Sequence, residues 1–311
     1  MLLSVIIPAR TEFPNIVHTC HNILSIYEAD GFDPKTIQLI IVDNCSSDND
    51  NWPQRGVKGT TAYLMPRGIY WSGMLKVIYD PIAGNHSARN KGVQIAQGKY
   101  LFFSDSHMSY KPGFFKYGLQ TLEETQGLVH GVIAWMGGYP PLNNDGSAHG
   151  LGFQYSLKLG EEIKGTWAPY ALSTQDWFYI AAQGHCSLFA IKDQFIKFGG
   201  YPKIHRTYGG GEFYIDTKWW MFGSNVVVEP RSIGYHLASS RGYSYNHDDY
   251  IENVLGMAYS LGMDDWRERA YINWLRHGRK EVLDAILARN EREYQPERDF
   301  ISKKRKKTFN E

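Results

Sequence analysis

The segment Ser87–His107, SARNKGVQIAQGKYLFFSDSH, indicates the α/β class of this chain, because a helix pattern and a strand pattern follow each other directly in it. Apolar residues at helical spacing predict a helix over Ser87–Gln97, and Gly98 ends it. The apolar run Tyr100–Phe103 then predicts a short buried strand. Four polar residues, Ser104–His107, come straight after the strand. A helix followed by a buried strand with a polar end is typical of an α/β sheet that binds its ligand at one edge.

Two earlier segments repeat this pattern. The apolar runs Leu2–Ile7 and Ile37–Val42 predict buried strands, and an amphipathic helix is expected between them at about Asn15–Ala29. Continuous apolar strands separated by helices indicate a parallel sheet that is covered on both faces. The second strand also ends in polar residues, beginning with Asp43. Because the carboxyl ends of parallel strands meet at one edge, we expect Asp43 to share that edge with the Asp105-Ser106-His107 triplet.

The composition is that of a globular protein. The chain has 311 residues, of which 43% are hydrophobic and 21% charged, and its formal net charge is +1. These values argue against disorder, a fibrous repeat or a coiled coil, and the length allows one large domain with appendages or two small domains. No apolar run approaches the ~20 residues of a membrane-spanning helix, and the start MLLSVIIPARTEF is not expected to be a secretory signal. The three cysteines are scattered and odd in number, so we expect a reduced protein in the cytoplasm.

The rest of the chain is less regular. Residues 130–180 are rich in Gly, Pro and aromatic residues, and we expect short strands and long loops there, with rings suited to stacking on sugars or bases. Later patterns predict strands at Cys186–Ile191 and Val226–Glu229, helices at Asp193–Phe198 and Glu212–Met221, and a helical region from Asp248 to about Tyr294. In that helical region the expected buried residues are Leu255, Tyr259, Trp266, Trp274, Leu283 and Ile286.

Asp105 and His107 have a spacing that can hold a metal ion. In an extended chain, residues two apart point to the same side, so the carboxylate and the imidazole would lie together. Oxygen and imidazole ligands suit Mn²⁺ or a similar borderline cation, and a third ligand would come from elsewhere in the chain. Short Asp-x-His sequences also arise by chance on protein surfaces, so the triplet alone does not establish a site.

Four blocks of the sequence together resemble a known superfamily. They are SVIIPAR at 4–10, IIVDNCSSD at 40–48, ARNKGVQIAQGKYLFFSDSH at 88–107, and a long segment at 186–236 that begins CSLFAIKDQ and ends RSIGYH. In order and spacing they resemble the nucleotide-sugar glycosyltransferases of the GT-A fold, with the nearest likeness to family two and to the polypeptide N-acetylgalactosaminyltransferases. The resemblance implies an α/β catalytic domain over 1–246 with a Rossmann-like mixed sheet flanked by helices, followed by a helical C-terminal extension with a basic tail at 247–311.

The resemblance also implies a metal-dependent hexosyltransferase that uses a UDP-sugar. In this superfamily an Asp-x-Asp or Asp-x-His triplet coordinates the metal on the donor diphosphate. Asp105 and His107 would therefore bind Mn²⁺ or Mg²⁺, and His236 stands where relatives supply the third ligand. Asp43 stands where relatives have an acidic residue that accepts a hydrogen bond from the nucleotide base, and a carboxylate suits the N3–H of uracil. A turn or a helix cap is the alternative role for Asp43.

Other residues of the matching blocks are assigned to the donor by the same resemblance. Arg89 matches a basic residue that approaches the donor phosphates, although the nearby Lys91 could serve instead. Arg241 lies in the segment 239–247, which could form a mobile lid over the donor, and it could add a phosphate contact. The remaining donor-binding candidates are Pro8, Arg10 and Ser104.

Glu212, which follows the glycines of YGGGE at 208–212, is the candidate general base. In inverting relatives a carboxylate at this helix start takes the proton from the acceptor hydroxyl, and the glycines let the acceptor come close. Relatives commonly show Gly-Glu-Asp or Gly-Glu-Asn where this chain has Gly-Gly-Glu, so Asp216 is the reserve candidate. For both carboxylates, the alternative is a charge favoured by the helix N-terminus. The Asp-x-His triplet resembles retaining enzymes whereas Glu212 suits inversion, and we favour inversion.

The acceptor is less defined by the sequence. Relatives that act on secreted polypeptides usually carry a membrane anchor and a lectin module, and this chain shows neither. We therefore expect a cytosolic acceptor, which could be a glycan or lipid-linked precursor, a protein side chain, or a hydroxymethylated base in DNA. The aromatic residues at 135–177 and the basic run Lys303–Lys307 would suit DNA, whereas a net charge near zero argues against it. A solvated tail is the simpler role for that run.

Two other functional classes stay open at this stage. A non-catalytic binding protein for sugar nucleotides or nucleic acids could use the same scaffold, but it would not need metal ligands and a base together. A metal-dependent phosphohydrolase would need more ligands than those found here. A Rossmann dehydrogenase is disfavoured because no G-x-G-x-x-G follows the first strand.

Overall fold

The computed structural model describes residues 1–46, 74–136, 148–150, 153–155, 165–167, 176–237, 246–276, 278 and 280–308. The strands are β1 (Leu3–Ala9), β2 (Ile37–Asn44), β3 (Leu75–Asp80), β4 (Tyr100–Ser104), β5 (Met108–Tyr110), β6 (Leu128–Met136), β7 (Ala148–Gly150), β8 (Phe153–Tyr155), β9 (Gly165–Trp167), β10 (Phe178–Tyr179), β11 (Ser187–Ile191) and β12 (Val226–Leu237). The α-helices are α1 (Asn15–Ala29), α3 (Asn85–Ile95), α4 (Phe114–Thr125), α5 (Lys192–Lys197), α6 (Gly211–Met221), α7 (His247–Leu261), α8 (Asp264–Leu275) and α9 (Lys280–Lys304), and a 3₁₀ turn, η1, spans Pro34–Thr36.

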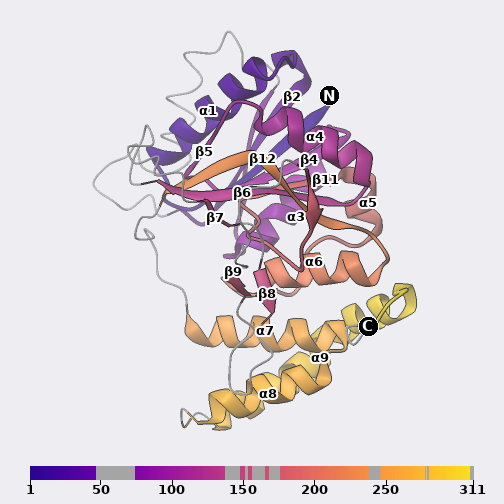
Figure 1. Ribbon diagram of the computed structural model, residues 1–311. Helices are drawn as coiled ribbons and strands as arrows, with labels where there is room; N and C mark the ends of the chain where they lie inside the picture. The colour runs from indigo at the N-terminus through magenta and orange to yellow at the C-terminus, as the bar shows by residue number, and fades with distance from the viewer. Residues whose placement is uncertain are drawn as a thin grey trace.

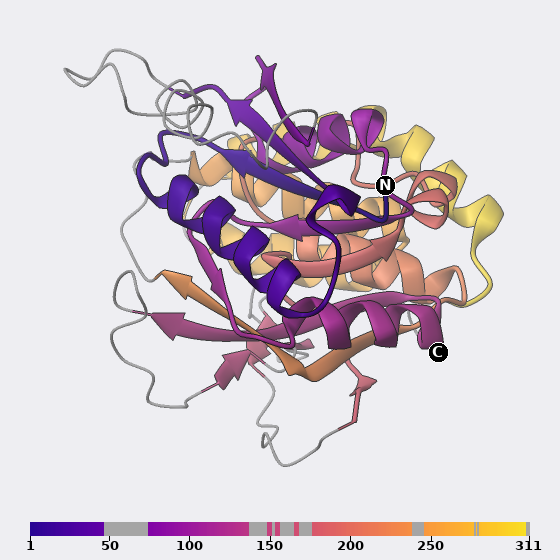
Figure 2. The same ribbon diagram turned by 90° about the horizontal axis from the view of Figure 1, so that it is seen from above.

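Within the described residues, a mixed sheet of ten strands forms the centre of the molecule, and helices cover both of its faces (Figure 1). The strand order is β10-β12-β6-β11-β4-β1-β2-β3, with β5 paired to β12 and β7 paired to β6. Seen from above, α1 and α4 lie over one face of the sheet while the C-terminal helices lie beyond the other (Figure 2). The predicted class, a mixed α/β sheet flanked by helices, is confirmed.

The strands are apolar throughout because both faces of the sheet are buried. In β1, Val5 and Ile7 belong to the core that includes α1 and α4, whereas Ile6 belongs to the core on the other side. Successive side chains of a strand point to opposite faces, so a strand between two helical layers needs apolar residues at every position. The continuous apolar runs in the sequence are therefore explained by burial of both faces of the sheet.

The parallel strands place their polar ends at one edge. β1 pairs in parallel with β2 on one side and with β4 on the other, with Ala9 opposite Asp43 and Ile6 opposite Phe103. The carboxyl ends of β2 and β4 therefore flank the end of β1, as the sequence predicts for Asp43 and the Asp105 triplet. β11 then joins β4 in the antiparallel sense, which makes the sheet mixed.

The C-terminal helices form a further layer below α6 (Figure 1). Their buried residues, which include Leu255, Trp266 and Leu283, belong to the same hydrophobic core cluster as Trp219 of α6 and Ile6 of the sheet. The predicted helical extension at 247–311 is thus packed onto the rest of the molecule, and the boundary at residue 246 stays a prediction. Tyr259, expected to be fully buried, is half-buried, and the other five predicted residues are buried.

Two strands differ from the sequence prediction. The last long strand does not end at Glu229 but continues to Leu237, because a register shift between Glu229 and Ile233 lets it pass Pro230, which has no N–H to donate. β6 is a buried strand beside it in a region expected to hold only short strands. Its Gly131 lies close to β12, because a Cβ there would lie 2.8 Å from the carbonyl oxygen of Ser232.

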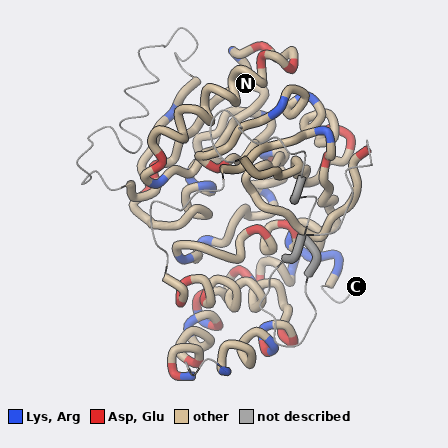
Figure 3. The backbone as a smooth tube through the Cα atoms, turned by 60° about the vertical axis from the view of Figure 1, so that its left-hand side comes forward, with Lys and Arg blue, Asp and Glu red and all other residues tan. Residues whose placement is uncertain are grey.

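Some predicted features fall outside the described residues. These include Arg241, nearly all of the proposed lid at 239–247, and most of the aromatic-rich segment at 137–175. In the part of the chain that is described, no helix is both long and apolar enough to cross a membrane. The basic run Lys303–Lys307 begins at the end of α9, continues beyond it and is exposed to solvent, as expected; Figure 3 shows Lys and Arg in blue near the C-terminus.

Candidate functional site

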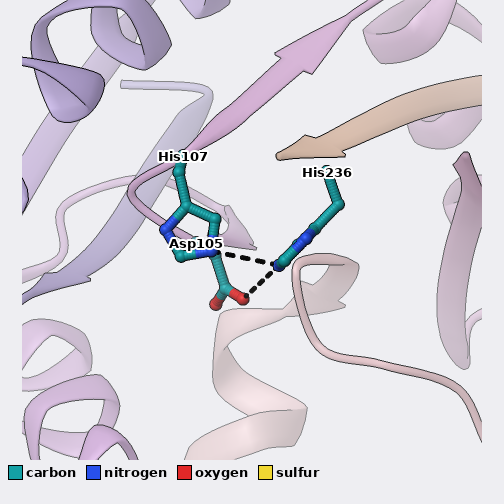
Figure 4. Close-up of side chains that lie close together, drawn as sticks. All are labelled: Asp105, His107 and His236. Atoms are coloured by element: carbon teal, nitrogen blue, oxygen red, sulfur yellow. Dashed lines mark hydrogen bonds and ion pairs between the residues drawn. The ribbon is translucent and has the colours of Figure 1, made fainter. Parts of the chain in front are cut away.

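Asp105, His107 and His236 meet at the polar edge of the sheet (Figure 4). Asp105 follows β4, and His107 stands immediately before β5. β5 pairs with β12 in a register that sets Met108 opposite His236, so His107 is carried to the side of His236. The Nε2 atoms of the two imidazoles lie 3.1 Å apart, and His236 Nε2 lies 3.5 Å from Asp105 Oδ2. The structure therefore brings together the three predicted ligands from two distant parts of the chain.

The donor set of this cluster fits a divalent metal ion. Its three ligand atoms lie within 4.8 Å of one another, and each residue is partly exposed, so an ion could reach it. His236 Nδ1 has no hydrogen-bond partner within the described residues. The carboxylate Oε2 of Glu12 lies 3.3 Å from His107 Nδ1, and such a contact keeps the proton on Nδ1 and turns the lone pair of Nε2 toward the cluster. Two imidazoles and one carboxylate suit Mn²⁺ and similar borderline ions.

Glu12 was not found by sequence reasoning. It lies in the loop after β1, two residues beyond the SVIIPAR block and 95 positions away from His107 in the chain. The contact exists only because β1 and β4 are paired in the sheet, so no local pattern could have signalled it.

Arg89 is a buried residue that pairs with Asp105 of the cluster. Its side chain is 2% exposed, and Nη2 donates to Asp105 Oδ1 at 2.9 Å and to the carbonyl oxygen of His185 at 3.3 Å. Burial opposes ionisation of Asp105, but the His236 hydrogen bond and the charges of Arg89 and His107 hold the pKa of Asp105 well below its ordinary value. Asp105 is therefore a carboxylate, as a metal ligand must be. The contact of Arg89 with donor phosphates stays a prediction, since its guanidinium bonds Asp105 here.

Glu212 lies near this cluster. Burial lowers the pKa of Arg89, but Tyr201, Asp105 and Glu212 together raise it above its ordinary value. The negative charges of Asp105 and Glu212 thus both stabilise the positive charge of the buried Arg89 guanidinium. Glu212 is partly exposed in the first turn of α6, where the free N–H groups of the helix favour negative charge. A carboxylate placed in this way can accept a proton from a group bound beside the cluster.

The glycine loop before Glu212 is held by close contacts. Gly209 and Gly210 have φ of +106° and +77°, values that residues with a Cβ rarely adopt. A Cβ on Gly209 would lie 2.3 Å from the Tyr250 ring of α7, and Asn253 of α7 donates from Nδ2 to the carbonyl oxygen of Tyr208. The first helical residue, Gly211, packs on the ring of His86. The loop that presents Glu212 is therefore shaped from both sides, by α3 and by α7.

Asp216 occupies a different environment from Glu212. Its side chain is fully buried, and it faces His130 and His185 in the interior. A general base must reach the acceptor hydroxyl, so of the two candidates the exposure of Glu212 favours it. The catalytic role of either residue stays a prediction.

The donor-binding candidates on the neighbouring strands are placed as follows. Asp43 is the next-to-last residue of β2, and its Oδ1 accepts the N–H of Ser46 at 3.0 Å, which is the turn role considered from the sequence. Pro8 and Arg10 lie at the end of β1, half-buried. Ser104 is fully buried; its Oγ lies 2.6 Å from Tyr110 Oη and donates to the carbonyl oxygen of Asp105 at 2.8 Å. These contacts make Ser104 part of the frame of the triplet, and its contact with a donor stays a prediction, as does that of Asp43.

Sequence comparison with known proteins found similarity to glycosyltransferases. Residues 4–179 match the profile described as glycosyl transferase family 2. Polypeptide N-acetylgalactosaminyltransferase 9 of Macaca fascicularis is 22% identical to this chain over 215 residues, which make up 66% of this chain and 34% of that protein. The chain thus spans a minor part of that relative's length.

Solved structures share the fold at low sequence identity. The crystal structure of GalNAc-T7 with UDP, GalNAc and Mn²⁺ is 17% identical, with a TM-score of 0.68, and the similarity covers 87% of this chain and 50% of that one. The structure of S. aureus TarS 1–349 in complex with UDP-GlcNAc is 14% identical, with a TM-score of 0.52, covering 93% of this chain and 71% of that one. The fold is therefore of the GT-A type predicted from the sequence, and the family profile, which matches more than half of the residues, shows that the chain belongs to glycosyl transferase family 2.

Proposed function

We propose that this protein transfers a sugar from a UDP-sugar to an acceptor hydroxyl with the help of Mn²⁺ or Mg²⁺. The observation that carries the proposal is the convergence of Asp105, His107 and His236 at the carboxyl edge of the sheet, with ligand atoms within 4.8 Å of one another. The structures of GalNAc-T7 with UDP and Mn²⁺ and of TarS with UDP-GlcNAc support the choice of a UDP-sugar donor and of a divalent ion.

The residues of the site have distinct parts in this reaction. Asp105, His107 and His236 hold the ion, and when bound the ion would offset the negative charge on the leaving diphosphate. Arg89 holds Asp105 in place through its 2.9 Å ion pair and keeps it ionised. Asp43, at the end of the neighbouring strand, is the candidate for the uracil contact. These assignments place the diphosphate beside the cluster and the base over the ends of β1 and β2.

Glu212 is the proposed general base. It removes the proton of the acceptor hydroxyl as the hydroxyl oxygen bonds to the anomeric carbon and the bond to the diphosphate oxygen breaks. This is a single displacement with inversion, and it needs no covalent intermediate on the enzyme. The partly exposed position of Glu212 in the first turn of α6 supports the proposal.

The acceptor is proposed only as a class. A hydroxyl on a glycan, a protein side chain or a hydroxymethylated DNA base meets the chemical requirement of Glu212. Cys20, Cys45 and Cys186 are free thiols, which supports a reducing compartment such as the cytoplasm.

Calorimetric titration with UDP tests the donor site. The wild type is expected to bind UDP in the presence of Mn²⁺ and to lose this binding when the metal is omitted. Asp105→Ala is expected to abolish metal-dependent binding, and Asp265→Ala, which removes an exposed carboxylate from α8, is the matched control that keeps it. Failure of the wild type to bind UDP with any divalent ion would overturn the donor assignment, and other nucleotides would then be tested.

The base assignment has a separate test. After a screen of UDP-sugars and acceptors has found a transfer reaction, Glu212→Gln is expected to keep UDP binding and to lower kcat by roughly 100-fold or more. A Glu212→Gln enzyme that transfers sugar at the wild-type rate would refute the role of Glu212 and leave the donor site intact.

A further inference from the structure

A second group of metal-ligating side chains lies inside the protein, apart from the Asp105 cluster. It consists of His130 from β6, His185 just before β11, and Asp216 from α6. All three side chains are fully buried. β6 and β11 are paired in the sheet with His130 opposite Leu188, and the two imidazole rings are nearly parallel, with centroids 5.7 Å apart.

The potential ligand atoms of the three side chains lie close together. His130 Nε2 lies 3.1 Å from Asp216 Oδ1, and His185 Nε2 lies 3.5 Å from the same oxygen. The contact of His185 Nε2 with Asp216 Oδ1 is a long ion-pair contact that lacks the geometry of a hydrogen bond, so within the described residues this buried nitrogen is only weakly satisfied. A weakly satisfied nitrogen beside a buried carboxylate is costly, and a cation among these atoms would remove that cost.

We propose that His130, His185 and Asp216 form a second, structural site for a divalent transition-metal ion, with Zn²⁺ as the best fit. Two ligand atoms about 2.1 Å from one tetrahedral ion are roughly 3.4 Å apart, and the two distances to Asp216 Oδ1 bracket that separation. Two imidazole nitrogens and one carboxylate oxygen suit Zn²⁺ better than Mg²⁺ or Ca²⁺, which prefer oxygen ligands.

Outer contacts hold two of the three ligands in position. His185 Nδ1 lies 2.6 Å from Tyr201 Oη, which is itself fully buried. In the metal-binding tautomer Nδ1–H donates to Tyr201 Oη, and Nε2 keeps its lone pair toward the cluster. The backbone N–H of Gln183 donates to Asp216 Oδ2 at 2.9 Å, which leaves Oδ1 directed at the two imidazoles. Support of this kind fixes the tautomer and the rotation of metal ligands.

The position of the group indicates a structural role. It joins β6, the segment before β11 and α6, and α6 is the helix that begins beside Glu212. Since no side chain of the group is exposed, release of a bound ion would need local opening of the fold, so a chelator would remove the ion only slowly from the folded protein. The Asp105 cluster differs because all three of its residues are partly exposed.

Metal analysis on an Asp105→Ala background, which disables the first cluster, tests the proposal. The protein is dialysed against EDTA in the folded state, and its metal content is then measured by mass spectrometry. We expect about one equivalent of Zn²⁺ per chain to remain, and we expect it to be lost when Asp216→Asn or His185→Gln is added. His205→Gln replaces another buried histidine outside the group and is expected to keep the ion.

A refolding experiment keeps the proposal testable if these variants fail to fold. The Asp105→Ala protein is unfolded in guanidinium chloride with EDTA and refolded with Zn²⁺, with Co²⁺ or without metal. A higher denaturant midpoint with Zn²⁺, together with visible d–d absorption from Co²⁺, supports the site. A metal-free protein that refolds to the same midpoint and takes up neither ion would show that His130, His185 and Asp216 form only a hydrogen-bonded group.

Discussion

Substitution of Gly211 by alanine tests the packing at the start of α6, the helix that carries Glu212. Alanine is expected to destabilise the protein here, although it usually stabilises a helix relative to glycine. Gly211 is the first residue of α6, and alanine in a helix is usually favoured over glycine by about 1 kcal/mol. Here a Cβ would lie 1.9 Å from Cε1 and 2.0 Å from Nε2 of His86. Atoms this close must separate by more than an ångström before they reach ordinary contact.

The ring of His86 has little room to move away. It is 1% exposed, stacks on Tyr201 with centroids 4.7 Å apart, and meets the ring of His205 edge-on at 4.1 Å. Relief of the clash must therefore shift α3 or the start of α6. Overpacking of this kind costs about 1–3 kcal/mol, so Gly211→Ala is expected to lower the free energy of unfolding by that amount despite the better helix propensity of alanine. Because Glu212 is the next residue, transfer activity is expected to fall as well.

A double-mutant cycle with His86→Ala measures the clash directly. In the His86→Ala background the obstructing ring is absent, so Gly211→Ala is expected to be neutral or to stabilise by up to about 1 kcal/mol. The coupling free energy between the two positions would then be about 1–3 kcal/mol. The assay is guanidinium chloride unfolding of the four proteins followed by circular dichroism. If Gly211→Ala is equally destabilising with and without His86, the steric reasoning is wrong.

Three further predictions concern other parts of the molecule. Glu12→Gln removes the carboxylate beside His107 Nδ1 and is expected to weaken Mn²⁺ binding about 10- to 100-fold, and an unchanged affinity in a metal titration would show that Glu12 does not orient the ligand. Burial lowers the pKa of Lys218 to about 8 although Glu297 raises it, so between pH 8 and its ordinary pKa of 10.5 the unfolded chain binds more protons and this residue makes stability increase with pH. Lys218→Met should remove that increase in urea unfolding measured from pH 7.5 to 10, and identical slopes would contradict the assignment. A chain truncated after residue 246 loses α7 to α9, which share a core with Trp219 of α6, and it is expected not to show a cooperative thermal transition; a sharp transition would establish 1–246 as an independent domain.

The core of the α/β fold could be predicted from the sequence because its strands are buried on both faces. The run Ile37–Val42 is apolar at every position but one, and this pattern is seen only where helices cover both sides of a sheet. The ends of elements are predicted less well, since β1 runs past Pro8 to Ala9 and α3 ends at Ile95, before Gly98. β6 was not predicted as a long strand because the Gly, Pro and aromatic residues of 130–180 show little periodicity. The close approach of Gly131 to the carbonyl oxygen of Ser232 depends on the distant strand β12.

The grouping of Asp105, His107 and His236 could be expected from the sequence, because Asp105 and His107 lie two residues apart and the resemblance of the later block to a known superfamily implies the third ligand. The binding of a metal ion by these residues stays a prediction. The tertiary structure alone decided how these residues are supported. Glu12 contacts His107, and the buried side chain of Arg89 pairs with Asp105. Asp216 contacts His130 and His185 in the interior. The contacts of Glu12 and Asp216 join parts of the chain that are far apart in the sequence. The physical reason is that the spacing of apolar residues in a strand or helix follows from which of its faces are buried, and this spacing can be read from neighbouring residues in the sequence. The partner of a polar side chain depends instead on which elements the folded chain brings side by side.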